Sequence, residues 1–177
     1  WNFDLVPSLQ ISNASGHTDY FLIPDGQGEW MRSDPRKAHE VVRTLNQAHY
    51  GQFVPSMRIL KFWKQKKGFG GISSFAFETF AAIVFRDMGA HPNIHLAFGC
   101  FFDKAPNHVF TAWSDPAGFS GDLASGIPLE TKNLLHKKLQ DASVVANGAY
   151  RDEWNGNHEA SIARWRAHLG DDFPTYG

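Results

Sequence analysis

The residue with the clearest chemical potential at the start of the chain is Asp4. It lies in a short apolar run, residues 3–7 (FDLVP), and the alternation over residues 1–6 predicts a β-strand. A carboxylate among large apolar side chains is unfavourable unless it is solvated, hydrogen-bonded or bound to a cation. Mg²⁺ prefers carboxylate oxygens together with substrate phosphates, and two-metal phosphoryl-transfer sites need several carboxylates around paired ions. Asp4 is therefore either a plain edge-strand residue or one member of a metal-binding set.

Two cations follow in a stretch of helical periodicity, Arg58 and Lys61. Because they are three residues apart, they share one face of a helix. Two cations beside a buried stripe could hold a triphosphate, although the same spacing occurs on ordinary amphipathic surfaces.

Ser74 opens an apolar helical stretch. A helix start with free N–H groups and a hydroxyl suits a phosphate, and the same hydroxyl could instead cap the helix. Glu78, four residues further along this apolar stretch, needs a cationic partner such as Arg58 or Lys61.

The net charge of −1 hides a local basic zone. Residues 31–68 hold nine Lys and Arg against two acids. Such a zone in a neutral protein favours a phosphate-bearing ligand over extensive nucleic-acid binding, with solvated helix faces as the plain alternative. Its basic members are Arg32, Arg36, Lys37, Arg43, Arg58, Lys61, Lys64, Lys66 and Lys67.

Several classes of protein are disfavoured by what the sequence lacks. It has no apolar run near the roughly 20 residues that span a bilayer, and no signal-peptide pattern. A single cysteine, Cys100, permits no internal disulfide and fits the cytoplasm. The histidines show no zinc spacing: His91 and His95 are four apart but lack cysteine or acidic company. No nucleophile elbow or Walker loop occurs.

The hydrophobic periodicity predicts an α+β fold in which a short hairpin precedes about six helices. The hairpin pairs a strand over residues 1–6 with one over 20–23, and residues 11–15 read as a turn. Ser33-Asp34-Pro35 is typical of a helix start. Residues 108–113 read as extended, and Trp165 and Phe173 should pack the last helix onto the others. Helices are expected from about 35, then over 53–66, 74–85, 92–102, 130–147 and 159–169, with Gly170 as a C-cap. A lone hairpin is marginally stable, which implies further strands upstream.

Taken together and in order, seven motifs resemble the C-terminal part of the bacterial cGAS/DncV-like nucleotidyltransferases, which are relatives of oligoadenylate synthase. The motifs are residues 4–7 (DLVP), 20–25 (YFLIPD), 30–35 (WMRSDP), Asn46, 58–63 (RILKFW), 74–78 (SFAFE) and 165–174 (WRAHLGDDFP).

The resemblance implies the last strands of a polymerase-β-like nucleotidyltransferase core over residues 1–32 and a helical domain over 33–177. It places Asp4 on a catalytic metal carboxylate, for Mg²⁺ or Mn²⁺. It places Lys61 and Ser74, with Arg58 more weakly, on triphosphate contacts. Members join NTPs such as ATP and GTP into cyclic or linear oligonucleotide second messengers in anti-phage defence.

The sequence also departs from the family pattern. The Gly-Ser helix start and the paired aspartates of the family do not occur in it, and they should precede Trp1. This chain alone is therefore expected to be inactive without an N-terminal catalytic half. The resemblance also implies partner proteins from a defence operon, whereas membrane or strong nucleic-acid binding is not expected. Two alternatives stay open: an RNA- or tRNA-end nucleotidyltransferase, and a non-catalytic helical module that senses a nucleotide or docks a partner.

Overall fold

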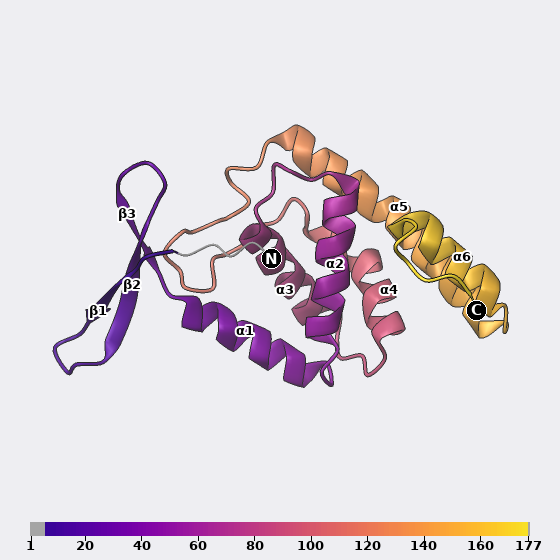
Figure 1. The fold of residues 1–177 in the computed structure, drawn as a ribbon, viewed down its shortest axis with the longest axis horizontal. Helices are drawn as coiled ribbons and strands as arrows, with labels where there is room; N and C mark the ends of the chain where they lie inside the picture. Colours follow the sequence, from indigo (N-terminus) through magenta and orange to yellow (C-terminus); the bar gives the residue numbers. More distant parts are fainter. Residues whose placement is uncertain (1–5, 177) are drawn as a thin grey trace.

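The structure is a computed structural model that describes residues 6–176. Within these residues the chain forms a three-stranded antiparallel sheet followed by six α-helices and one 3₁₀ turn. The α+β prediction is therefore confirmed. Figure 1 shows the sheet at one end of the molecule, next to α1, with the remaining helices gathered beyond it. No helix among residues 6–176 is long and apolar enough to cross a membrane.

The sheet has the order β1-β2-β3, with β1 at Leu9–Ser12, β2 at Thr18–Pro24 and β3 at Trp30–Ser33. The register sets Leu9 opposite Leu22, and Ile23 opposite Met31. Both hairpin loops are closed by a polar side chain: Asn13 Oδ1 accepts from two backbone N–H groups, and so does Asp25 Oδ1.

The strand prediction was partly wrong. The strand that forms the first hairpin with β2 is Leu9–Ser12. Of the predicted strand over residues 1–6, residues 1–5 lie outside the described part, and Val6 is in a loop. Alternation of Leu9 and Ile11 with polar residues was short enough to be read as a turn. The strand β3 was also missed, because Trp30 to Ser33 follow a glycine-rich loop and carry little apolar alternation.

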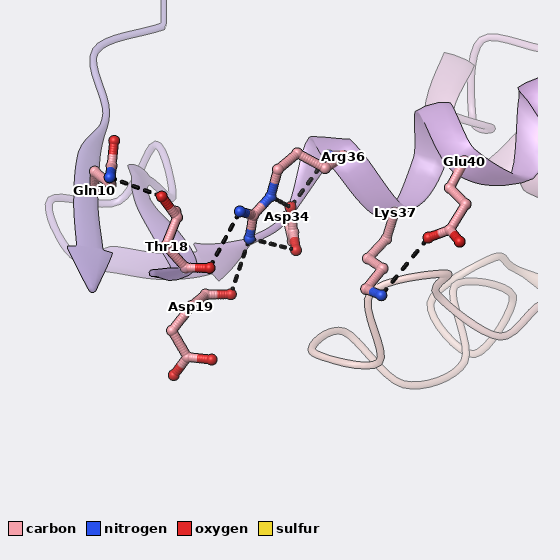
Figure 2. A network of polar contacts seen from close by, with 7 residues as sticks. All are labelled: Gln10, Thr18, Asp19, Asp34, Arg36, Lys37 and Glu40. Atoms are coloured by element: carbon pink, nitrogen blue, oxygen red, sulfur yellow. Dashed lines mark hydrogen bonds and ion pairs between the residues drawn. The ribbon is translucent and has the colours of Figure 1, made fainter. Parts of the chain in front are cut away.

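The helix start at Asp34-Pro35 is confirmed, and it also fastens the helices to the sheet (Figure 2). Asp34 caps α1 (Pro35–Ala48) by accepting from the Arg36 backbone N–H at 3.1 Å. The Arg36 guanidinium donates to both Asp34 oxygens, at 2.7 and 2.9 Å, and to the carbonyls of Thr18 and Asp19 on β2, at 3.1 Å each. Arg36 accordingly lowers the pKa of Asp34. One arginine thus orients α1 relative to β2.

The remaining helices match their predicted positions, with shifts at their ends. α2 spans Phe53–Lys67, α3 Ser74–Asp87, α4 Ile94–Lys104, α5 Leu129–Trp154 and α6 His158–Leu169. α5 runs seven residues beyond its predicted end. The predicted extended piece at 108–113 was wrong: a 3₁₀ turn at Ala105–His108 leads into turns, and Ser114 forms an isolated bridge with Asp122.

An aromatic core fills the space between these helices. α3 lies at its centre, with eight of its fourteen residues buried, as its nearly uniform apolar character predicted. Trp165 of α6 packs on Phe98 of α4 with ring centroids 5.2 Å apart, and Phe173 lies partly buried against the core. Both residues therefore pack the last helix onto the others, as expected.

α6 is joined to α2 by polar contacts as well as by packing. The buried Trp63 indole donates to His168 Nε2 at 2.8 Å, and Lys67 donates to the His168 carbonyl at 2.8 Å. Lys66 forms an ion pair with Asp172 at 2.7 Å, just past the end of α6. Burial, with a contribution from Lys67, lowers the pKa of His168 to about 4, so that its ring is neutral and can accept the hydrogen bond from the indole N–H.

Candidate functional site

An open groove of about 700 Å³ runs along α2, over the loop that follows it and onto the start of α3. It brings together Arg58, Lys61 and Ser74, which the sequence had singled out separately. The full lining is Arg58, Lys61, Phe62, Lys64, Gln65, Gly68, Phe69, Gly70 and Ser74.

The orientation of α2 follows from its buried stripe. Met57, Leu60 and Trp63 face the core, so that Arg58 and Lys61 point toward solvent on another face of the helix. The helix ends at Gly68, whose φ of 77° is the left-handed conformation that glycine adopts readily. Phe69 and Ile72 are buried and anchor the following loop, which delivers the chain to α3 beside the cations.

Ser74 does not cap α3, which corrects one of its two expected roles. The N-cap is Ser73, whose hydroxyl accepts from the Ala76 N–H at 3.1 Å. Ser74 is the first helical residue, is exposed and lines the groove. Its hydroxyl is thus not committed to the cap, and the first N–H groups of any helix lack intrahelical acceptors. The hydroxyl and these N–H groups can donate hydrogen bonds to a phosphate oxygen at this end of the groove.

The predicted partner of Glu78 is Lys61, with which it forms an ion pair. Both side chains remain partly open to water, 46% for Lys61 and 39% for Glu78. Arg58 and Lys64 form no ion pair with any described residue. Burial, helped by the positive charge of Lys61, lowers the pKa of Lys64, whose Nζ lies 5.8 Å from the centroid of the Phe77 ring. Three cations and one carboxylate therefore set the charge of the groove and its edge.

Five of the other six members of the basic zone, all except Arg43, have partners elsewhere. Arg36 joins α1 to the sheet, Lys37 pairs with Glu40 at 3.7 Å, and Arg32 lies over the Tyr20 ring at 4.8 Å. Lys66 and Lys67 hold α6. The zone is thus not one continuous surface: most of its cations serve local structure, and the groove holds three.

Asp4, the predicted metal carboxylate, lies outside the described residues, so its distance from the groove is not part of this structure. Among residues 6–176 there is no group of three or more His, Cys, Asp or Glu side chains that could hold a metal ion. Glu78 is the carboxylate closest to Ser74 in the sequence, and it already forms an ion pair with Lys61. The described residues alone therefore do not make a Mg²⁺ site.

The remaining candidates for chemistry are structural. His49 is buried and bonds the Phe85 carbonyl at 2.9 Å, and burial raises the pKa of the Cys100 thiol, which makes it a poor nucleophile. Sequence reasoning missed Lys64 as a groove residue. Its spacing of three from Lys61 and six from Arg58 was a usable signal, because such positions lie along one side of a helix.

Comparisons with known proteins indicate what the chain is similar to. The chain matches no family model. It is 28% identical over 176 residues to the probable cyclic nucleotide synthase of Bacillus cereus (strain VD146), an alignment that covers 99% of this chain and 53% of that protein. The chain thus spans about half the length of the curated relative that it matches. The similarity extends over nearly the whole chain and indicates a relationship to a cyclic nucleotide synthase.

Proposed function

We propose that this chain is the C-terminal part of a nucleotidyltransferase that joins NTPs into cyclic, or linear, oligonucleotide second messengers in bacterial anti-phage signalling. One observation carries the proposal: the groove gathers Arg58, Lys61 and Ser74 in a chain that is similar to a cyclic nucleotide synthase. The substrates would be nucleoside triphosphates, with ATP and GTP as the first candidates.

The groove would bind the triphosphate of the nucleotide. Arg58 and Lys61 can donate charge-assisted hydrogen bonds to phosphate oxygens. Ser74 and the start of α3 add a hydroxyl and the positive end of a helix dipole. A lysine held against the phosphates also neutralises charge that develops on departing pyrophosphate, which is how fixed cations stabilise such transition states. The role of this chain is thus to bind and orient the reacting phosphates.

The same proposal divides the chain into two domains. Residues 1–32 would be the last strands of the nucleotidyltransferase core, and residues 33–177 its helical domain. The apolar residues that the sheet exposes support this, since Leu9, Trp30 and Met31 are 52%, 49% and 40% exposed. An exposed apolar sheet of three strands favours coverage by further protein. The N-terminal half of the same protein would supply it.

Catalysis would need residues beyond the described ones. Asp4 would be the catalytic metal ligand of this chain, joined by carboxylates from the N-terminal half. When bound, Mg²⁺ or Mn²⁺ would activate the attacking ribose hydroxyl and neutralise the phosphates. We expect the chain by itself to be inactive, to work in the cytoplasm, where NTPs are abundant, and to be coupled to partner proteins of the defence system.

A polynucleotide acceptor, as in an RNA- or tRNA-end nucleotidyltransferase, is less well supported. An extended phosphate backbone needs many unpaired cations along its path. Here Arg36, Lys66 and Lys67 have structural partners, and the net charge is −1. A non-catalytic nucleotide-sensing or partner-docking module would have the same fold. The synthesis experiment below distinguishes it from the synthase.

The test is synthesis by the complete protein. It is incubated with radiolabelled NTPs and Mg²⁺, and the Asp4→Asn variant is run beside wild type. We expect oligonucleotide product from wild type and a loss of at least about a hundredfold from Asp4→Asn, because the metal ion that such a ligand would hold offsets the charge of the transition state. Equal product from both would show that Asp4 is not a ligand. Tight NTP binding without product under any nucleotide combination would favour the sensing module.

A further inference from the structure

The ion pair between Lys61 and Glu78 has a consequence for any phosphate that enters the groove. Glu78 lies on α3, one helical turn after Ser74, and reaches across to Lys61 on α2. The phosphate-binding lysine of the proposed site is thus already bound to a carboxylate. A phosphate must either share this lysine with Glu78 or replace Glu78 as its partner.

The other two cations of the groove are not restrained in this way. Arg58 and Lys64 line the groove without an ion pair to any described residue. Lys64 is partly buried next to Lys61, and the two positive charges disfavour each other there. An incoming phosphate can therefore bind Arg58 and Lys64 first. To bind Lys61 as well, it must displace Glu78.

We propose that Glu78 sets the affinity of the groove for phosphate by competing with the ligand for Lys61. The inference rests on the proposed function only in that the groove binds phosphate. In the empty groove Glu78 neutralises Lys61 and keeps the local charge low, and in the occupied groove the phosphate takes the lysine. Release of product is faster for the same reason, since Glu78 remains close enough to reclaim its partner.

The exposure of the pair makes the exchange feasible. A solvent-exposed ion pair contributes up to about 1 kcal/mol, which corresponds to at most about a fivefold change in affinity. A triphosphate carries several negative charges and makes stronger, charge-assisted hydrogen bonds, so it can displace a single carboxylate. The competition should therefore weaken phosphate binding severalfold without preventing it.

A second ion pair between a lysine of α2 and a carboxylate provides a matched control. Lys66 and Asp172 form an ion pair of similar exposure on the lysine side, 43% against 46% for Lys61, but neither residue lines the groove. Neutralising either carboxylate changes the net charge by the same amount. A difference between the two variants must then come from position.

The experiment is calorimetric titration of the complete protein with inorganic tripolyphosphate at low ionic strength, where charge effects are largest. Glu78→Gln should bind about three- to fivefold more tightly than wild type, because one exposed ion pair no longer competes. Asp172→Asn should match wild type. In a Lys61→Met background, Glu78→Gln should no longer tighten binding. Thermal unfolding of each variant verifies that it is folded.

Three results would overturn this inference alone. Weaker binding by Glu78→Gln would mean that Glu78 positions Lys61 for the ligand, and unchanged binding would mean that the pair is irrelevant to the groove. Tightening that persists with Lys61→Met would reveal only a general charge effect. Each of these leaves phosphate binding, and hence the proposed function, intact. Absence of tripolyphosphate binding by wild type would overturn both.

Discussion

Two faces of α2 carry lysines with different tasks. On the face toward α6, Lys66 is paired with Asp172 and Lys67 donates to the His168 carbonyl. On the face toward the groove, Lys64 has no ion pair with a described residue, and Lys61 has one that is partly exposed to water. The two sets are adjacent in sequence and alike in composition. Their partners alone distinguish a cation that holds the fold together from one that is available to a ligand.

The difference arises from where the helix meets its neighbours. The buried stripe of Met57, Leu60 and the fully buried Trp63 fixes how α2 is rotated about its axis. Residues three to four positions apart lie on the same side of a helix. Once the rotation is set, one side of α2 therefore contacts α6 and another side lines the groove. The buried stripe, which ends in the Trp63 ring, thus determines which lysines are structural.

The largest expected effect comes from removing that ring. Trp63→Ala should lower the free energy of unfolding by about 4 kcal/mol, since it leaves a cavity and deprives His168 of its donor. Urea denaturation followed by circular dichroism measures it. Lys64→Ala, on the groove face, is the control and should change stability by less than about 0.5 kcal/mol. Similar losses from both would contradict the division of α2 into a structural face and a proposed ligand-binding face.

A smaller effect is expected when the two lysine sets are compared in ligand binding. Lys61→Ala should weaken NTP binding by the complete protein by about 2 kcal/mol, roughly thirtyfold, because a charge-assisted hydrogen bond is lost. Lys66→Ala should weaken it less than about twofold, since a distant exposed charge is screened. Isothermal titration calorimetry gives both affinities. Equal affinities for the two variants would rule out a phosphate role for Lys61.

The smallest expected effect is the pH dependence of the α6 face. Burial lowers the pKa of His168 from 6.5 to about 4 in the folded protein, so between these values the unfolded chain binds more protons. The contribution of His168 to the free energy of unfolding should therefore be fully present above pH 6.5 and should fall as the pH is lowered toward 4. The charges of Lys67, Lys138 and Asp141 also act on the ring, and Trp63 donates a hydrogen bond to it. We expect a loss of about 1.5 kcal/mol, reduced from the full linkage value because the ring retains contact with water.

Urea unfolding at several pH values between 7 and about 4 tests this, with His168→Gln as the comparison. That variant keeps an acceptor for the indole but does not titrate, so this part of the pH dependence should disappear. An unchanged slope in His168→Gln would show that other groups cause the acid sensitivity. The groove face should be indifferent to the substitution, with NTP affinity at neutral pH within about twofold of wild type.

The helices were predictable because their hydrophobic repeats are long. The stripe of Met57, Leu60 and Trp63, and the nearly all-apolar α3, leave few alternatives to a buried helix. Asp34 followed by Pro35 is a strong local start signal, and it was right. The short strands were less predictable: four residues of alternation in β1 and almost none in β3 give a weak local signal, and pairing with β2 supplies the rest.

Within the site, local chemistry was ambiguous where neighbours compete for one role. Ser73 and Ser74 are equivalent as sequence, and the backbone at Ser73, with φ −60° and ψ 157°, decided which one caps α3. Glu78 was expected to need Arg58 or Lys61, and only the approach of α3 to α2 selected Lys61. The predicted role of Asp4 remains a prediction, because that residue lies outside the described part of the chain.

By itself the sequence determined the helical elements, the basic zone and the three phosphate-binding candidates on α2 and α3. These depend on periodicity and side-chain type, which are local properties. Tertiary structure alone decided that Arg58, Lys61 and Ser74 share one groove, that Lys64 joins them, and that Lys66 and Lys67 are used to hold α6. Partners that are distant in sequence become neighbours only when the helices pack, and charge acts through those neighbours.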